Sequence, residues 1–389
     1  MQIKNIKFII IVLILFLCLT YGEDVFATPF IPKSDSTVLE KLPKINLKQS
    51  RNKKFETKNE AIDFIKQCIE LTRKNSDPRY LGYGEKVVNE WLARNSSDSD
   101  FLVLRGIVNQ YNHNFEDALS DLSLVTKHDS KNIQAWLTKA AILETKGEYE
   151  EAKKCCFEIL RQSNQFLSIA CASSAGSHTG AAKKSYLLLK TTFGDGINLS
   201  KEEKIWALTI LSDIAYRLGD MQAAESYLRN AINLDSENSY LLTVYSDFLI
   251  ESGKPYEVLK LLKEKTAIDP LLLRLAIAEK KLGLPSQKYH IKELESRFQA
   301  LHRREDFIHR REEALFHLKL TENYKLALKI AEKNWEIQKE PIDTKIFLEA
   351  AIKSNDLSKI KKLETFINKN KLEDINLSRL INKTNTKDL

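Results

Sequence analysis

One stretch of the sequence gathers side chains that could hold a metal ion or transfer protons: His302, Glu305, His309, Glu312, Glu313 and His317. On a helix, His309 and Glu313 stand four residues apart, as do Glu313 and His317, so each pair shares a face. Pairs of this kind also give weak support to an ordinary solvated helix. A turn expected near Glu305-Asp306 places His302 on another helix. We favour the solvated helix and keep a metal-dependent enzyme using the His309 region as an alternative.

The motifs of the common enzyme classes are missing from the sequence. It contains no phosphate-binding loop, no HExxH motif, no Gly-x-Ser-x-Gly elbow and no Gly-rich dinucleotide turn. The formal net charge is +7, and the basic residues are scattered among acidic ones. The sequence therefore predicts a protein without catalysis, cofactor or bound metal, and without a nucleic-acid partner.

Four cysteines follow the N-terminal region: Cys68, Cys155, Cys156 and Cys171. Cys156 and Cys171 are expected on neighbouring helices that pack together, which makes a disulfide between them geometrically plausible in an oxidising compartment. The alternative is that all four are small buried apolar residues. Metal binding by Cys155-Cys156 is not expected, because adjacent residues on a helix point in different directions and no His lies at ligand spacing.

The N-terminus has the layout of a secretory signal peptide. Lys4 and Lys7 precede an apolar run from Phe8 to Leu19, and Val25-Phe26-Ala27 places small side chains before a cut after Ala27. The apolar run is short for a membrane span. We predict export to the periplasm or the medium with cleavage near Ala27, and keep a retained membrane anchor as the alternative.

A period of 34 residues runs through the middle of the chain and indicates the elements that position these side chains. It relates Ala118 to Ala152, Phe115 to Tyr149, Ser212 to Ser246 and Gly219 to Gly253. Repeats of this length are helix-turn-helix units that stack into an array with one continuous core. A content of only 12 Gly and 8 Pro suits long helices. The sequence therefore predicts an all-α protein.

The clearest unit runs from residue 133 to residue 166. Trp136 and Ala140 share a face of its first helix, Gly147 breaks the helix, and Tyr149 and Ala152 open the second. This order of aromatic, small, glycine, aromatic and small residues closely resembles the consensus of the tetratricopeptide repeat (TPR) family. The resemblance implies an α-α superhelix, or TPR solenoid, of about eight helical hairpins, some of them degenerate.

The repeat marks divide the chain into six parts. We predict a signal peptide at 1–27, an extended leader at 28–56, an N-terminal helical pair at 57–98, a TPR core at 99–270, degenerate TPR-like helices at 271–363 and a C-terminal tail at 364–389.

The resemblance also implies where a partner binds. In TPR arrays the first helices line a concave groove, and on this register the groove residues are Gln134, Thr138, Trp206, Thr209, Asp213, Tyr216, Tyr240, Thr243, Asp247, Glu312 and Glu313. Acids and aromatics stand where carboxylate-clamping members of the family carry Lys, Arg and Asn. The groove is thus expected to favour an extended peptide with basic or aromatic groups. The alternative is that these side chains pack between repeats or face water.

Several strings are similar to a group of exported TPR proteins of Gram-negative bacteria: Pro29-Phe30-Ile31-Pro32, Asp77-Pro78-Arg79-Tyr80-Leu81-Gly82-Tyr83, Leu271-Leu272-Leu273-Arg274-Leu275-Ala276 and His309-Arg310-Arg311-Glu312-Glu313-Ala314. This resemblance implies a periplasmic helical array and no established activity. The sequence therefore predicts an exported scaffold or adaptor for a protein or peptide partner. A membrane-tethered assembly factor for an envelope complex is the alternative, with membrane contact only if the N-terminal segment is retained.

Overall fold

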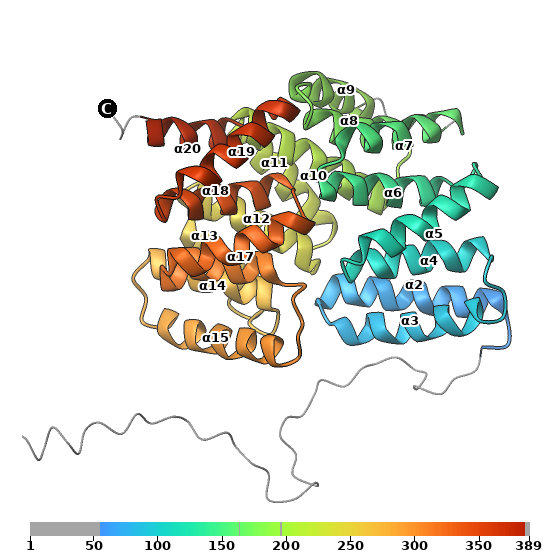
Figure 1. Cartoon of the computed structure of the whole chain (residues 1–389), viewed down its shortest axis with the longest axis horizontal. Helices are drawn as coiled ribbons and strands as arrows, with labels where there is room; N and C mark the ends of the chain where they lie inside the picture. The colour runs from blue at the N-terminus through green and yellow to red at the C-terminus, as the bar shows by residue number, and fades with distance from the viewer. Residues whose placement is uncertain (1–54, 163, 195–196, 386–389) are drawn as a thin grey trace, which may run out of the picture. The chain divides into compact units, whose positions relative to one another are not determined.

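The computed structural model describes residues 55–162, 164–194 and 197–385. The predicted signal peptide and nearly all of the extended leader lie outside the described residues. Within them the protein is all-α and forms an α-α superhelix of nine helical hairpins, against about eight expected, followed by a last helix, α20 (Ile375–Asn385) (Figure 1). None of the described helices is both long and apolar enough to cross a membrane.

Each hairpin pairs a first helix with a second helix. The first helices are α2 (Lys58–Asn75), α4 (Ser99–Tyr111), α6 (Ile133–Lys146), α8 (Gln165–Ser177), α10 (Lys201–Leu218), α12 (Ser239–Glu251), α14 (Asp269–Lys281), α16 (Arg310–Phe316) continued by the π-helix η1 (His317–Thr321), and α18 (Pro341–Lys353). The second helices are α3 (Pro78–Leu92), α5 (Phe115–His128), α7 (Tyr149–Arg161), α9 (Ala182–Gly194), α11 (Met221–Leu234), α13 (Pro255–Leu262), α15 (Gln287–Arg303), α17 (Tyr324–Ile337) and α19 (Leu357–Asn370).

The helices begin and end at residues that the sequence marks clearly. The Asn132 side chain accepts a hydrogen bond of 3.0 Å from the amide of Ala135 and caps α6. Ser200 and Glu203 form a reciprocal capping box at the start of α10. Gly147 ends α6 with φ of 78°, a left-handed conformation that a side chain would strain. Local chemistry therefore sets the boundaries of the repeat units.

The hairpin turn, meaning the turn between the two helices of a hairpin, contains a left-handed residue in all nine described hairpins. These residues are Ser76, His113, Gly147, Gly180, Gly219, Gly253, Gly283, Glu322 and Asn355. Five of them are glycine, which adopts positive φ at little steric cost. In an array of stacked helical hairpins such turns follow one another along one edge.

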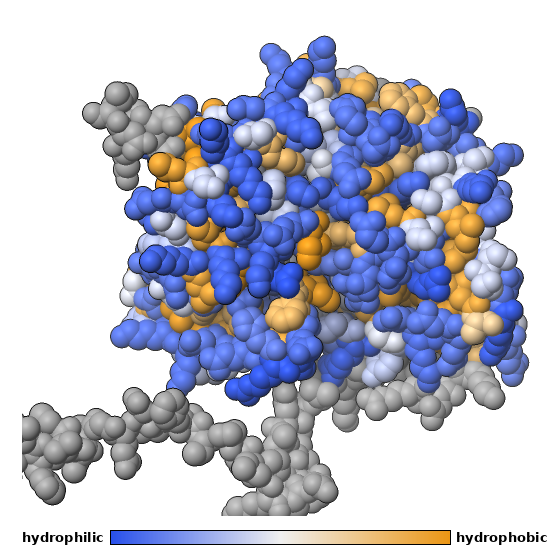
Figure 2. All heavy atoms as spheres, in the orientation of Figure 1, coloured by the Kyte–Doolittle hydropathy of each residue, from blue (hydrophilic) through white to orange (hydrophobic). Residues whose placement is uncertain are grey.

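Close helix packing depends on small residues at the contacts. Ala140 and Ala152 are almost completely buried where α6 meets α7. A Cβ added to Gly106 of α4 would lie 2.9 Å from Cγ of Leu122 on α5, so no larger residue fits there without movement. Charged and polar side chains cover most of the face drawn in Figure 2, with apolar side chains between them.

A disulfide between Cys156 of α7 and Cys171 of α8 joins two successive hairpins. Their Cα atoms lie 5.5 Å apart, within the range that a disulfide spans. Cys68 and Cys155 are free and buried. Burial raises the pKa of the Cys68 thiol to about 12 and that of Cys155 to about 11, so both stay protonated and unreactive at neutral pH.

The array also closes on itself, because late segments contact the hairpin turns of early repeats. The amide of Lys339 donates a hydrogen bond of 2.7 Å to the carbonyl of Thr145, and its ammonium reaches the carbonyl of Lys146 at 3.2 Å. The hydroxyl of Tyr149 donates to the carbonyl of Lys339 at 3.1 Å. The segment between α17 and α18 is therefore held on the turn between α6 and α7.

A second late segment, from the end of α19 to the start of α20, contacts the next two hairpin turns. The Glu373 carboxylate accepts a hydrogen bond of 2.6 Å from the amide of Ala182, the first residue of α9. The Asn376 side chain donates to the carbonyl of Tyr216 at 3.4 Å, near the end of α10. Helix α20 also contacts α10 and α18.

The C-terminal boundary differs from the expectation of a tail at 364–389. Helix α19 continues to Asn370, and α20 occupies most of the remaining chain. Leu377 of α20 is only 1% exposed and belongs to the largest apolar cluster. The short, polar sequence of α20 hides this role, because its few apolar residues are buried by distant helices and not by a repeat partner.

Candidate partner-binding face

The groove residues predicted on α6 and on the first half of α10 mostly serve the fold. Gln134 is exposed and donates a hydrogen bond of 3.1 Å to the hydroxyl of Thr138, which is buried. Trp206 is half-buried and packs against two apolar clusters, so it bridges neighbouring repeats. The Thr209 hydroxyl donates to the carbonyl of Trp206 at 2.8 Å. Of these four side chains, only Gln134 is well exposed.

The next four residues of the predicted groove lie on α10 and α12 and differ in whether other groups of the protein bind their side chains. Asp213 is exposed and pairs at 2.9 Å with Arg217, whose own side chain is buried. The hydroxyl of Tyr216 accepts a hydrogen bond of 3.3 Å from Lys345 of α18. Tyr240, at the start of α12, is 59% exposed. The Thr243 hydroxyl donates a hydrogen bond to the carbonyl of Ser239 within the same helix.

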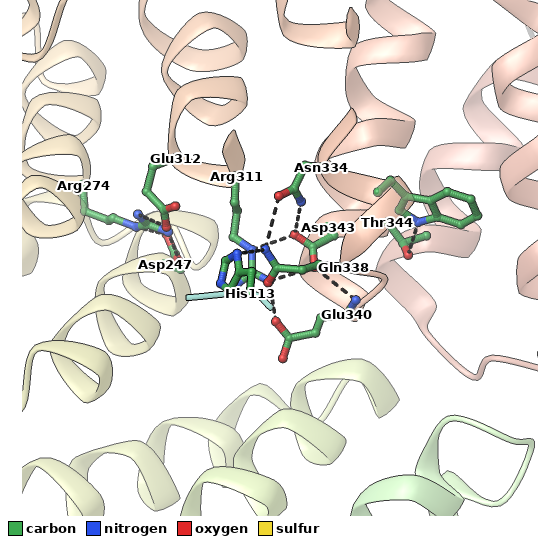
Figure 3. A network of polar contacts seen from close by, with 11 residues as sticks. His113, Asp247, Arg274, Arg311, Glu312, Asn334, Gln338, Glu340, Asp343 and Thr344 are labelled. Atoms are coloured by element: carbon green, nitrogen blue, oxygen red, sulfur yellow. Dashed lines mark hydrogen bonds and ion pairs between the residues drawn. The ribbon is translucent and has the colours of Figure 1, made fainter. Parts of the chain in front are cut away.

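Asp247 and Glu312 hold a buried arginine between three first helices. Arg274 of α14 is 1% exposed, and its guanidinium donates two hydrogen bonds of 2.9 Å to the carboxylate of Asp247 on α12. Glu312 of α16 lies 3.7 Å from the same guanidinium (Figure 3). Burial alone would raise the pKa of Glu312, but Arg274 and Arg311 lower it, so its carboxylate is ionised. These two predicted groove residues are thus engaged inside the protein.

Arg311 of α16 organises the segment that closes the array. Its guanidinium donates hydrogen bonds of 2.6 and 2.7 Å to Asp343 and one of 3.1 Å to Gln338, and it pairs with Glu340 (Figure 3). Asn334 donates a further bond of 2.7 Å to Asp343. Burial alone would lower the pKa of Arg311, but Asp343 and Glu340 raise it well above its ordinary value. Arg311 therefore fixes the residues on both sides of Lys339.

His113 links the Arg311 network to the turn between α4 and α5. Its Nδ1 lies 3.3 Å from Nε2 of Gln338. Burial, together with the charge of Arg311, lowers the pKa of His113 to about 4. The imidazole is therefore neutral at physiological pH, and Nδ1 accepts a hydrogen bond from the Gln338 amide.

Carboxyl groups lie around one exposed aromatic ring on the face shared by Glu144, Asp213, Tyr240 and Glu340, called the inner face below. Burial raises the pKa of Tyr240 to about 12, and the carboxylates of Glu340 and Asp213 add to this effect. The ring is accessible to water, yet the surrounding helices displace enough solvent to disfavour its anion. Burial raises the pKa of Glu144 to about 8, and the same two carboxylates again contribute. The inner face thus offers an aromatic ring beside carboxylates.

The His and Glu residues that suggested a metal site are mostly separated. Nε2 of His302 on α15 lies 2.9 Å from the carboxylate of Glu313, which is buried. His317 instead contacts Thr321 at 3.0 Å. Helix α15 ends at Arg303 and α16 begins at Arg310, so the turn predicted near Glu305-Asp306 is confirmed. Among the described residues, no three His, Cys, Asp or Glu side chains are arranged to hold a metal ion.

Sequence reasoning missed the cations that engage the predicted groove residues. Arg217, Arg274, Arg311 and Lys345 each pair with a carboxylate on the inner side of the array. Arg274 alone could have been recognised from the sequence, since it is the one charged residue in the apolar run from Leu271 to Ile277. A single arginine in such a run must be buried and needs a carboxylate partner.

Comparison with known proteins gives a family for two parts of the chain. Residues 133–161, which include all of α6 and α7, and residues 207–238, which include most of α10 and all of α11, match the model of the tetratricopeptide repeat. No curated protein matches the sequence. Both matched segments are among the units in which the 34-residue marks are clearest. Repeats of this family support a protein-interaction scaffold.

Several solved structures are similar at low identity. A tetratricopeptide repeat protein from Parabacteroides merdae is 10% identical over 74% of this chain and 99% of its own, with a TM-score of 0.38. Human IFIT1, solved as a dimer with PPP-AAAA, is 12% identical over 75% of this chain and 69% of its own, with a TM-score of 0.45. Yeast Tom70 is 10% identical over 84% and 95%, with a TM-score of 0.25. Likeness at this level says nothing about partners.

Proposed function

Since this chain carries tetratricopeptide repeats, we propose that it is a non-catalytic scaffold or adaptor that binds a protein or peptide on its inner face. The observation that carries the proposal is Tyr240, whose ring is 59% exposed while Thr243 and Asp247 on the same helix are engaged within the protein. A large aromatic side chain left free beside carboxylates is a plausible anchor for a partner.

The chemistry of the inner face selects the kind of partner. The Tyr240 ring can receive a cation on its face. The carboxylates of Asp213 and Glu340 lie near it, and both stay partly exposed although each pairs with an arginine, so they can also contact an incoming cation. We therefore propose an extended segment that presents a Lys or Arg side chain to Tyr240. Gln134 offers a further exposed polar group on α6.

We further propose that the protein is exported and acts in the periplasm or outside the cell. Two features support this: the order of Lys4, Lys7 and an apolar run before Ala27, and the disulfide between Cys156 and Cys171, which oxidising compartments favour. An uncut N-terminal segment would instead make the protein a membrane-tethered assembly factor. The mass of the N-terminal peptide distinguishes these two forms.

The test compares partner capture by the full chain, by Tyr240→Ala and by a control, Tyr289→Ala. Tyr289 is 67% exposed on α15, a helix that contributes no residue to the inner face, and so matches Tyr240 in chemistry and exposure. Trp206 is unsuitable for this purpose, because it packs between repeats.

We expect Tyr240→Ala to lose a specific partner that wild type and Tyr289→Ala both retain, with circular dichroism unchanged in all three. The captured partner is then identified, and peptides from it with and without their Lys or Arg residues are titrated. Equal capture by Tyr240→Ala would show that the inner face is not the binding surface.

A further inference from the structure

The row of hairpin turns is a docking edge that the protein itself uses five times. In chain order, the first five left-handed turn residues contact later segments as follows: Ser76 with Ser239, His113 with Gln338, Gly147 with Lys339, Gly180 with Lys371 and Gly219 with Ile375. The next two, Gly253 and Gly283, have no heavy atom within 4 Å of an added Cβ. The edge therefore continues past its last internal contact as an uncovered surface.

A hollow lies on this uncovered stretch. It has a volume of about 490 Å³ and is lined by Arg229, Gly253, Lys254, Pro255, Tyr256, Glu257 and Leu282. Tyr256 is 60% exposed and Leu282 is 38% exposed, so the hollow presents two large apolar groups to solvent. It joins the turn between α12 and α13 to the turn between α14 and α15.

The charges around the hollow leave a positive excess. Arg229 and Lys254 both lie 2.7 Å from a single carboxylate, that of Glu225. Glu257 pairs with Lys260 at 3.6 Å. Two carboxylates thus face three cations, so an incoming carboxylate is favoured and an incoming lysine is not.

The last internal contact shows what fits such a turn. The side chain of Ile375 lies over Gly219, with Cδ1 3.5 Å from the position of an added Cβ. Two acidic residues, Glu373 and Asp374, directly precede it outside any helix. Glu373 itself binds the amide of Ala182. The Asp374 carboxylate instead accepts hydrogen bonds from the amides of Asn376 and Leu377 at the start of α20. This edge therefore already accepts an aliphatic side chain together with one carboxylate that precedes it.

We propose that the hollow beside Gly253 binds an extended segment of another protein in which carboxylates precede an aliphatic residue. The aliphatic side chain lies over Gly253 between Tyr256 and Leu282, and the carboxylates lie near Arg229 and Lys254. This surface is separate from the inner face and takes a partner of opposite charge. A scaffold with both surfaces brings a basic segment and an acidic segment together on one molecule.

The experiment uses the full chain and a fluorescent peptide that copies residues 371–377, Lys-Leu-Glu-Asp-Ile-Asn-Leu. The protein's own copy occupies the turn at Gly219, which leaves the hollow for the added peptide. A second peptide carries Lys in place of the Glu and the Asp. Anisotropy titrations compare wild type with Tyr256→Ala, Lys254→Glu and the control Tyr289→Ala.

We expect the acidic peptide to bind and the Lys peptide to bind far more weakly. Tyr256→Ala should weaken binding about tenfold, as for an interface aromatic, and Lys254→Glu about threefold, as for an exposed ion pair. Tyr289→Ala should bind like wild type. Equal binding of both peptides, unchanged binding by Tyr256→Ala, or no binding at all would each overturn the proposal. Sedimentation showing a dimer that only Tyr256→Ala abolishes would assign the hollow to a second copy instead.

Discussion

Tyr149 and Lys339 are joined by a hydrogen bond of 3.1 Å although they stand 190 positions apart in the chain. The contact ties the third hairpin to the segment between the eighth and the ninth. In an ordinary solenoid each repeat touches only its neighbours, and stability is a sum of local terms. Here the long-range contacts couple the two halves of the array.

Tyr149→Phe should weaken this closure without disturbing the core, because only the hydroxyl that donates to Lys339 is removed. We expect a loss of about 1 kcal/mol in the free energy of unfolding, as for one hydrogen bond. Hydrogen exchange should become faster at the amide of Lys339. Unchanged exchange there would show that the Tyr149 hydroxyl does not hold the closing segment.

Arg311→Ala should be far more damaging, because it leaves Asp343 buried without its cation and frees Glu340. Loss of one partner of a buried ion pair costs about 3–5 kcal/mol. Arg161→Ala is the control, since Arg161 forms only an exposed pair with Glu158 and its loss should cost less than about 1 kcal/mol. Urea unfolding measures both variants. Similar losses in the two would mean that the Arg311 network contributes little.

Glu144→Gln should change how stability depends on pH. The carboxyl has a pKa of about 8 in the folded protein, against an ordinary value of 4.5. Between these values the unfolded chain releases a proton that the folded protein keeps, so wild-type stability falls as pH rises. The variant has no such proton. Its melting temperature relative to wild type should therefore rise from about pH 4.5 to about pH 8 and then level off. A constant difference across this range would contradict the assigned pKa.

Reduction of the Cys156–Cys171 disulfide should lower stability, because it releases a closed loop with a sequence separation of 15. A loop of this size corresponds to about 3 kcal/mol in the chain-entropy model. The Cys156→Ser, Cys171→Ser double variant should match reduced wild type and show no response to reductant. A non-reducing digest checks the bond directly, and free thiols at both positions would refute it.

The local part of this fold is readable from sequence, and the long-range part is not. Gly147 between Ala140 and Ala152 predicts a hairpin, because glycine suits a left-handed turn and the two alanines allow the helices on either side to pack closely. No comparable signal pairs Lys339 with Thr145. Their approach depends on the rotation that accumulates over several repeats, and a small change per repeat would separate them.

The same limit explains the mixed outcome at the inner face. Counting along the repeat places Asp247 and Tyr240 on the first helices, but it does not say which of them a cation from another hairpin will engage. Arg274 reaches Asp247, whereas no arginine reaches Tyr240 closely enough to bond its hydroxyl in the described structure. Only the packed arrangement of α12, α14 and α16 decides between the two.

Closure of the array also fixes how many repeats the protein can have. An open solenoid gains or loses a unit easily, since a duplicated hairpin meets the same neighbours as before. In this chain the turns at Gly147, Gly180 and Gly219 each rest on a particular later residue. Inserting or deleting one hairpin between Gly219 and Lys339 would shift those pairings out of register at once. Homologues of this protein should therefore differ by substitutions and keep the same number of repeats. Insertions and deletions should be confined to the ends of the chain and the exposed loops.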